Sequence, residues 1–110
     1  MPADSVLTVA DLKLDRVERR VERASKRIEL TSKEFGLLEY LMLNAGRRVS
    51  RTMIIEHVWN LSFDSGTNVI DVYVNYLRRK VDNGFGRRLI HTVRGVGYEL
   101  SATDSSGPRP

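Results

Sequence analysis

The stretch from Asn68 to Asp82, N-V-I-D-V-Y-V-N-Y-L-R-R-K-V-D, constrains the fold of this chain more than any other. Its apolar side chains recur at the spacing of one face of an α-helix. The stripe that they form consists of Ile70, Val74, Leu77 and Val81. Because most of a helix's stability in a protein comes from packing such a stripe, the sequence predicts a helix over 68–82 that covers a core.

The opposite face of this predicted helix carries amides, cations, a phenol and one valine. Its members are Asn68, Asp71, Val72, Asn75, Tyr76, Arg78, Arg79 and Lys80. Amide and guanidinium groups make paired hydrogen bonds to base edges, and a valine methyl can contact a thymine methyl. We interpret this face as a surface for the major groove of DNA. A solvated face of chance composition is the alternative, and the central position of Val72 argues against it.

Size and charge fit a small polyanion-binding domain. The chain has 110 residues, enough for one domain, and a formal net charge of +4. Cations gather in the segment 78–94, where Asp82 is the only acid. The absence of cysteine excludes disulfides, thiolate zinc sites and cysteine nucleophiles. Without a membrane-length apolar run or a signal-peptide pattern, we expect a cytosolic protein with no membrane partner.

The N-terminal part predicts short antiparallel strands. Apolar and polar residues alternate from Leu7 through Val21, and Arg27 to Leu30 gives a third strand. Residues 15–16 and 24–26 are the expected turns. The charged face formed by Arg19, Arg20, Glu22 and Arg23 is expected to be a soluble exterior, or a contact surface for a neighbouring copy.

Two further helices precede the helix over 68–82. Residues 31–34, T-S-K-E, form a capping box, and the helix that they begin should run to about Asn44. Val49 enters a short extended segment, and Ser50 should cap a helix over 51–59. Residues 60–67 form a turn-rich loop, after which Thr67 or Asn68 should cap the third helix.

A β-hairpin is predicted to close the domain. Its strands are 89–93 and 98–100, and its tip carries Arg94 beside two glycines. The element order indicates an α+β fold: a winged helix-turn-helix with an N-terminal antiparallel sheet, three helices and a C-terminal β-hairpin wing. We divide the chain into a linker (1–6), this domain (7–100) and a disordered tail (101–110).

Several motifs make the chain similar to a known family. These are L-T-S-K-E-F-G-L-L-E-Y-L (30–41), V-S-R (49–51), V-W (58–59), D-V-Y-V-N-Y-L-R-R-K (71–80) and T-V-R-G-V-G-Y (92–98). In order and spacing they resemble the effector domain of OmpR/PhoB-type response regulators. The segment F-D-S-G-T-N-V-I-D-V (63–72) is most similar to the heavy-metal-responsive branch of that family.

The resemblance implies a transcription factor in a bacterial two-component system, located in the cytoplasm. Family members carry a receiver domain that an upstream histidine kinase phosphorylates. The residues before Leu7 could not form one, so an excised domain is favoured over a stand-alone relative. Relatives bind tandem DNA half-sites as head-to-tail dimers, and some contact RNA polymerase through the segment that matches residues 60–67.

The resemblance also assigns roles to individual residues. Those directed toward bases are Asp71, Val72, Asn75, Tyr76, Arg78, Arg79 and, in the minor groove, Arg94. Those directed toward phosphates are Arg51, Trp59, Thr67, Asn68, Lys80, Thr92 and Tyr98. Four of these have competing structural interpretations: Asp71 as a helix cap or a partner that orients an arginine, Arg94 as a turn residue, Tyr98 as a core residue, and Arg51 as a surface residue at a helix start by chance.

No catalytic, metal or cofactor site is predicted. His57 and His91 have no acidic partner at metal-ligand spacing, and Gly95-x-Gly97 lies in a hairpin rather than between a strand and a helix. No nucleophile–base–acid set can be named, so an enzyme is not expected. The alternative function is a protein-interaction module that docks an acidic partner. An RNA-binding function is weaker, because the sequence offers no aromatic platform for single bases.

Overall fold

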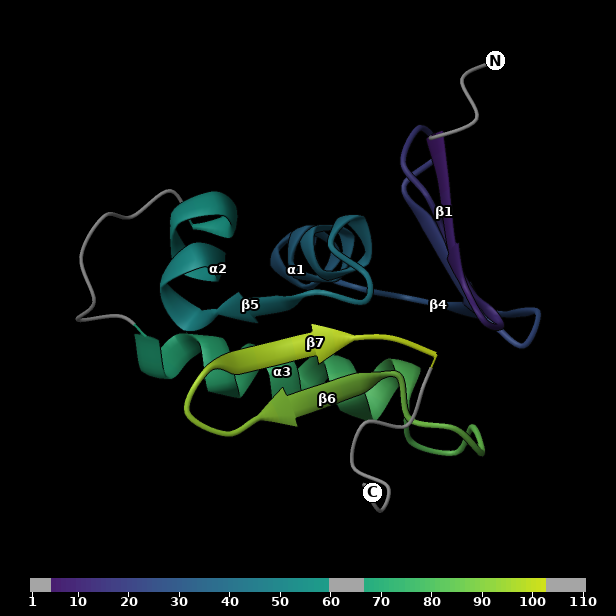
Figure 1. Ribbon diagram of the computed structural model, residues 1–110. Coiled ribbons are helices and arrows are strands. Elements are labelled where there is room, and N and C mark those ends of the chain that lie inside the picture. The colour runs from purple at the N-terminus through teal and green to yellow at the C-terminus, as the bar shows by residue number, and fades with distance from the viewer. Residues whose placement is uncertain (1–4, 60–66, 103–110) are drawn as a thin grey trace.

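The computed structural model describes residues 5–59 and 67–102 (Figure 1). In this part of the chain four strands come first and three helices follow, with one short strand between the first and second helix. A hairpin comes last. The elements are β1 (Val6–Val9), β2 (Leu12–Asp15), β3 (Arg20–Arg23), β4 (Lys26–Ile28), α1 (Ser32–Leu43), β5 (Arg48–Ser50), α2 (Arg51–Val58), α3 (Thr67–Val81), β6 (Ile90–Val93) and β7 (Gly97–Leu100).

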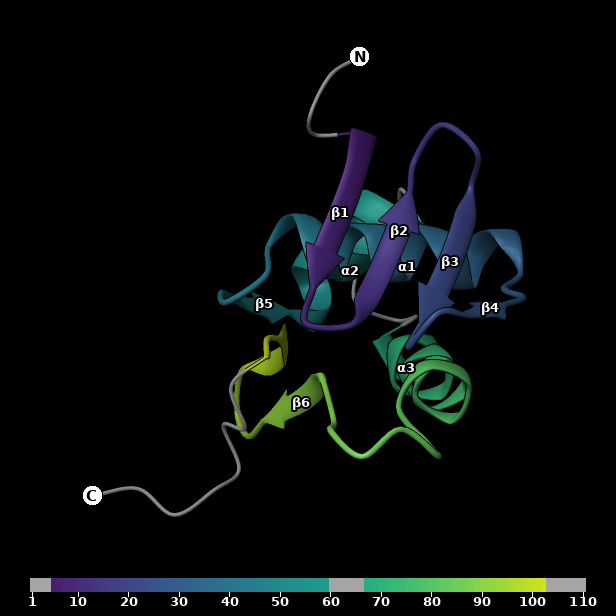
Figure 2. The same ribbon diagram turned by 90° about the vertical axis from the view of Figure 1, so that its right-hand side faces the viewer.

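The N-terminal sheet is antiparallel, with strand order β1-β2-β3-β4. Leu14 of β2 pairs with Val21 of β3, and both side chains are buried, so the inner face packs on the core. Figure 2 shows this sheet lying over α1, and β1 packs directly against that helix. The sheet thus covers one side of α1.

Two details of the predicted N-terminal sheet were wrong. A tight turn at Ala10 and Asp11 separates β1 from β2, so the sheet has one strand more than expected. Residues 16–19 form the next turn, which leaves the side chain of Val17 66% exposed instead of buried. Ala10 adopts a φ of 54° and Arg19 a φ of 53°, although glycine is the usual residue at such angles.

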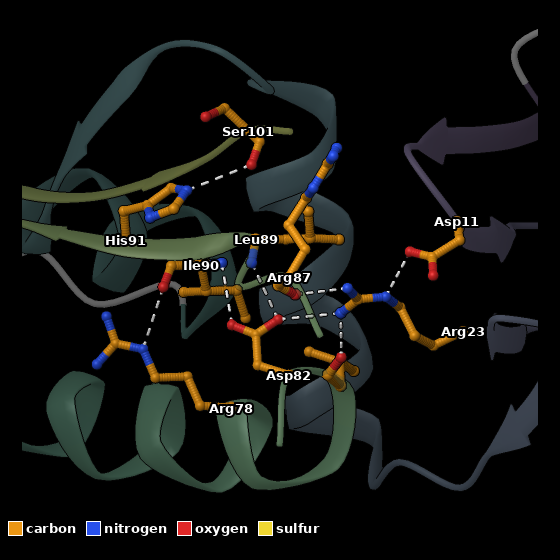
Figure 3. A network of polar contacts seen from close by, with 10 residues as sticks. Asp11, Arg23, Arg78, Asp82, Arg87, Leu89, Ile90, His91 and Ser101 are labelled. Carbon is orange, nitrogen blue, oxygen red and sulfur yellow. Dashed lines mark hydrogen bonds and ion pairs between the residues drawn. The ribbon is translucent and has the colours of Figure 1, made fainter. Parts of the chain in front are cut away.

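Arg23 is a further correction, because it does not lie on the solvated face of the sheet. Its side chain is 1% exposed and donates to the carboxylates of Asp11 and Asp82 (Figure 3). It also donates to the backbone carbonyls of Val81 and Arg87. Arg23 therefore joins the N-terminal sheet to the end of α3 and to the loop that leads into β6.

The three helices pack against one another around a single core, and their predicted starts are largely confirmed. Thr31 and Glu34 form the predicted capping box of α1, and the Ser50 hydroxyl accepts from the Met53 amide at the start of α2. Helix α3 begins at Thr67, so Thr67 belongs to the helix instead of preceding it as its cap. The predicted loop over 60–67 lies almost wholly outside the described residues.

The C-terminal hairpin is confirmed, and it contributes to a second sheet with strand order β5-β7-β6. Val49 of β5 pairs with Tyr98 of β7, a pairing that the sequence did not indicate. The sheet attaches the hairpin to the segment between α1 and α2, and the hairpin lies beside α3 (Figure 1). Three helices with this hairpin make a winged helix-turn-helix fold. No described helix has both the length and the apolar character needed to cross a membrane.

Candidate nucleic-acid interface

Helix α3 has one fully buried face. Ile70, Val74, Leu77 and Val81 are all 0% exposed and belong to the core cluster. The stripe predicted from the sequence is therefore confirmed as the anchor of the helix. Burying four aliphatic side chains of this size stabilises the fold by about 1.5–3 kcal/mol each.

The opposite face of α3 is not covered by any described part of the chain. Val72 is 43% exposed and Tyr76 41% exposed, and the side chains of Asn75 and Arg79 are exposed as well. The guanidinium carbon of Arg79 lies 5.9 Å from the centre of the Tyr76 ring, close enough for a cation–π contact. We call Val72, Asn75, Tyr76 and Arg79 the outer face of α3.

Asp71 flanks the outer face but is held by two neighbours. Arg51 of α2 donates from Nε to Asp71 Oδ1 at 2.8 Å, and the Tyr98 hydroxyl of β7 donates to the same oxygen. Partial burial raises the pKa of this carboxyl, but the hydrogen bonds from Tyr98 and Arg51, with the charge of Arg51, hold it below its ordinary value. Asp71 is therefore an ionised carboxylate that orients Arg51 and Tyr98.

The ring of Tyr98 is a core element with two guanidinium groups beside it. The residue is 4% exposed, and the guanidinium carbons of Arg51 and Arg78 lie 5.2 and 5.6 Å from its ring centre. Burial, followed by the hydrogen bond to Asp71, raises the pKa of the Tyr98 hydroxyl. The Tyr98 hydroxyl thus remains protonated and donates its proton in the hydrogen bond to Asp71.

Arg78 links α3 to the hairpin. Its Nη2 donates to Thr92 Oγ1 at 2.5 Å and its Nε donates to the Ile90 carbonyl at 3.3 Å. The side chain is half-buried, and this burial is the main reason that the pKa of Arg78 lies below its ordinary value. Arg78 and Thr92 together fix the distance between the helix and the wing.

Lys80 is also paired within the protein. Its Nζ lies 2.6 Å from Glu34 Oε1, the same oxygen that accepts from the Thr31 amide in the capping box of α1. Glu34 is 4% exposed, whereas the Lys80 side chain is 38% exposed. The pair joins the last turn of α3 to the first turn of α1.

The remaining predicted contacts lie at the wing and at the end of α2. Arg94 and Thr92 are exposed on the hairpin, and Gly95 at the tip has a φ of 77°. Trp59 is half-buried against Tyr73, with 5.1 Å between ring centres in an edge-to-face arrangement. The side chains of Thr67 and Asn68 fall outside the described part of the structure.

The interpretation of Asp71 as a residue that orients an arginine is confirmed by its contact with Arg51, but the sequence did not identify this partner and missed the other polar contacts that support the surface. Arg51 and Asp71, Lys80 and Glu34, and Arg23 and Asp82 are each at least 20 residues apart in the chain. The sequence shows that these residues are charged, but no rule of sequence spacing predicts which of them form pairs. In the described residues, no three histidine, aspartate or glutamate side chains gather in a way that could hold a metal ion.

Comparisons with known proteins match this arrangement. Residues 25–100 match the family described as "Transcriptional regulatory protein, C terminal". The transcriptional regulatory protein CusR of Escherichia coli K12 is 52% identical over 101 residues, which cover 92% of this chain and 44% of CusR. TrcR of Mycobacterium tuberculosis is 48% identical over 99 residues, which cover 90% of this chain and 38% of TrcR. This chain thus spans less than half the length of the curated relatives that it matches.

Solved structures give the same result. The DNA-binding domain of E. coli CpxR superposes with a TM-score of 0.78 at 32% identity, and the match covers 89% of this chain and 98% of that one. The Klebsiella pneumoniae RstA DNA-binding domain, solved in complex with the RstA box, gives a TM-score of 0.80 at 26% identity, with coverage of 89% and 98%.

The fold and the uncovered helix face define a winged-helix, DNA-binding class of protein. The chain belongs to the family of C-terminal domains of transcriptional regulatory proteins, as found in OmpR/PhoB-type response regulators. It is an effector domain of a transcriptional regulator, not an enzyme.

Proposed function

We propose that this chain binds double-stranded DNA sequence-specifically, with α3 in the major groove and Arg94 of the wing in the adjacent minor groove. The observation that carries the proposal is the contrast between the two faces of α3. The inner stripe is 0% exposed, while Val72, at the centre of the outer face, is 43% exposed. An α-helix fits the major groove of B-form DNA, and exposed amides and guanidinium groups can distinguish its base pairs.

Within this proposal, base contacts belong chiefly to the outer face of α3. Asn75 favours adenine and Arg79 favours guanine, because each can make two hydrogen bonds to that base. Val72 supplies a methyl contact and Tyr76 a mixed apolar and polar one. We assign Asp71 and Arg78 a supporting role at the base edges, since both already bind neighbours in the protein.

The proposed phosphate contacts surround this face. Arg51 and Thr92 are held at its border by Asp71 and Arg78, and Trp59 can donate from its indole nitrogen. Thr67 and Asn68, at the start of α3, complete the proposed set. Lys80 and Tyr98 are proposed to act mainly by positioning, because Glu34 pairs with the Lys80 ammonium and Asp71 accepts the one hydroxyl proton of Tyr98.

The proposal extends to the regulator of which this domain is a part. We infer that it acts in the cytoplasm of a bacterium, in a two-component system whose histidine kinase phosphorylates a separate receiver domain. Two copies are proposed to bind tandem half-sites head to tail, with the second copy adding most of the useful affinity. Contact with RNA polymerase through residues 60–67, and a response to heavy metals, remain predictions from the resemblance.

Titration of a duplex at several salt concentrations tests the DNA-binding proposal. Neutralising about five phosphates should give a slope of log affinity against log salt of about −4 to −5. Asn75→Ala should relax the preference at one base position by about 1–3 kcal/mol and leave this slope unchanged. Arg20→Ala, an exposed cation of β3, is the matched control and should change neither quantity.

The competing function, docking of an acidic protein, makes the opposite prediction. If no duplex from a random pool bound at low salt, the DNA-binding proposal would be rejected in favour of a protein partner. If duplexes bound but Asn75→Ala and Arg79→Ala both left every base preference intact, the proposed base contacts of α3 would be rejected.

A further inference from the structure

A hollow of about 320 Å³ lies beside the outer face of α3, on the side of the hairpin. The C-terminal half of α3 forms one wall and the segment entering β6 forms the other. The lining residues are Asn75, Arg78, Arg79, Asp82, Asn83 and Arg88. It therefore combines three guanidinium groups and two amides with a single carboxylate.

The carboxylate of the hollow is not available to balance these cations. Asp82 is 5% exposed, and its Oδ1 accepts from Arg23 at 3.2 Å and from the Leu89 amide at 3.1 Å. Its Oδ2 accepts from the Ile90 amide at 3.1 Å. Figure 3 shows these contacts on the side of Asp82 toward Arg23 and the β6 backbone. Asp82 thus makes its ion pair with Arg23 behind the hollow and forms none with Arg79 or Arg88.

The two exposed cations of the hollow have no ion-pair partner in the described part of the chain. Arg79 and Arg88 are exposed, and no ion pair joins either of them to an acid in residues 5–59 or 67–102. Burial is the main reason that the pKa of Arg78 is lowered, and the charge of nearby Arg88 also lowers it, whereas the charges of Tyr98, Asp82 and Asp71 act in the opposite direction. A cluster of like charges of this kind favours an anion in the space between them.

The position of the hollow identifies the anion. Cations that border a groove-binding helix usually contact the DNA backbone, because phosphates lie on both sides of the groove. The hollow adjoins the outer face of α3 through Asn75 and Arg79, and it lies at the base of the hairpin, where Asp82 accepts from the Leu89 and Ile90 amides.

We propose that this hollow is a backbone-phosphate site, in which Arg88 binds a phosphate of the DNA strand that borders the major groove. The inference rests on the proposed DNA binding and adds Arg88 to the contacts. Arg88 carries no base information in this role, because a phosphate is the same for every sequence. It adds affinity equally for every sequence.

The test compares Arg88→Ala with Arg87→Ala. Arg87 is the neighbouring exposed arginine, but it lines a different hollow, beside Asp11 and Phe85. Removing one phosphate contact should make the salt slope of Arg88→Ala shallower by about 0.9, with the same base preferences in a random duplex pool. When salt is raised from about 50 to 200 mM, the affinity of the wild type should fall by a factor about three times larger than the affinity of this variant. Arg87→Ala should keep the wild-type slope, and Arg88→Lys should largely restore it.

The outcomes separate this inference from the function on which it rests. If the wild type selects a preferred duplex but Arg88→Ala and Arg87→Ala keep the same slope, the phosphate site is wrong and the DNA-binding function stands. If Arg88→Ala changes base preference at one position, Arg88 contacts a base and the inference is also wrong. If the wild type binds no duplex, both proposals are rejected. Equal melting temperatures of the wild type, Arg88→Ala and Arg87→Ala would exclude unfolding as the cause of a change in slope.

Discussion

Lys80 in the last turn of α3 donates to Glu34 in the first turn of α1 across 2.6 Å. Glu34 is 4% exposed and already closes the capping box of α1, so the pair ties the proposed recognition helix to the start of another helix. Burial alone would raise the pKa of Glu34, but the hydrogen bonds from Lys80 and Thr31 and the charge of Lys80 hold it below its ordinary value. The resemblance directs Lys80 toward a phosphate, whereas this contact favours a positioning role.

Replacing Lys80 by alanine distinguishes the two roles. We expect Lys80→Ala to lower the free energy of unfolding by about 1–2 kcal/mol, because the buried Glu34 carboxylate loses a charged donor. The salt slope of DNA binding should hardly change. Urea denaturation measures the first quantity, with Lys26→Ala, an exposed lysine of β4, as the control. Unchanged stability with a slope shallower by about one would instead assign Lys80 to a phosphate.

The same pair predicts how stability depends on pH. The folded-state pKa of Glu34 lies below its ordinary value of 4.5, so ionised Glu34 stabilises the fold at neutral pH. This contribution is complete above the unfolded-state pKa and is lost as the pH falls through the folded-state value. We expect the stability difference between wild type and Glu34→Gln to be largest near neutral pH and to shrink in acid. A difference that stayed constant down to about pH 3 would contradict this account.

Asp71 has two possible roles that a binding-site selection can separate. The Asp71 carboxylate holds Arg51 and Tyr98. Asp71→Ala should therefore weaken the binding free energy for every duplex by a similar amount, on the order of 1 kcal/mol. Arg51→Ala should give the same result, and the double variant should be little weaker than either single one, because the two residues act together. A preference altered at one base position in Asp71→Ala alone would show direct base contact instead.

Arg23 is expected to be the most important charged residue for stability. It is 1% exposed and neutralises Asp82, so Arg23→Ala leaves a buried carboxylate without its charge partner. We expect a loss of about 3–5 kcal/mol in the free energy of unfolding. Arg20→Ala, on the same strand but exposed, should change it by less than about 0.5 kcal/mol. Similar urea midpoints for the two variants would mean that the Arg23 contacts do not stabilise the fold.

The helices could be predicted because their signals are local. The periodicity of α3, the capping box at Thr31 and the Ser50 cap each depend on residues within one or two turns of each other. The wing was equally accessible, since two glycines and an arginine between alternating residues favour a hairpin. These elements were found at their expected places, within one or two residues at their ends.

The remaining features depend on contacts between distant parts of the chain. Alternation along R-R-V-E-R puts Arg23 on the face of buried Val21 and Arg20 on the opposite face. The sequence does not show that this face can hold a cation, because the carboxylate that accepts from Arg23, Asp82, lies 59 residues away. The turn at Ala10 was missed because no glycine marks it, although its φ is 54°. The pairing of β5 with β7 was also missed, because its two strands are distant in the sequence. In addition, a strand as short as Arg48–Ser50 carries no periodic signal.

Gly97 gives the sharpest test of how the wing is attached. At this position a Cβ would lie 2.1 Å from the carbonyl oxygen of Val49, so β5 could not stay paired with β7. We expect Gly97→Ala to cost at least about 2–3 kcal/mol of folding free energy, because the obstructing atom belongs to the backbone and cannot rotate away. Gly95→Ala is the matched control, since its φ is +77° but nothing lies within 4 Å, and it should cost only about 1 kcal/mol. Urea denaturation measures both losses, and an equal cost for the two variants would show that backbone strain, not the approach of β5, explains the glycine.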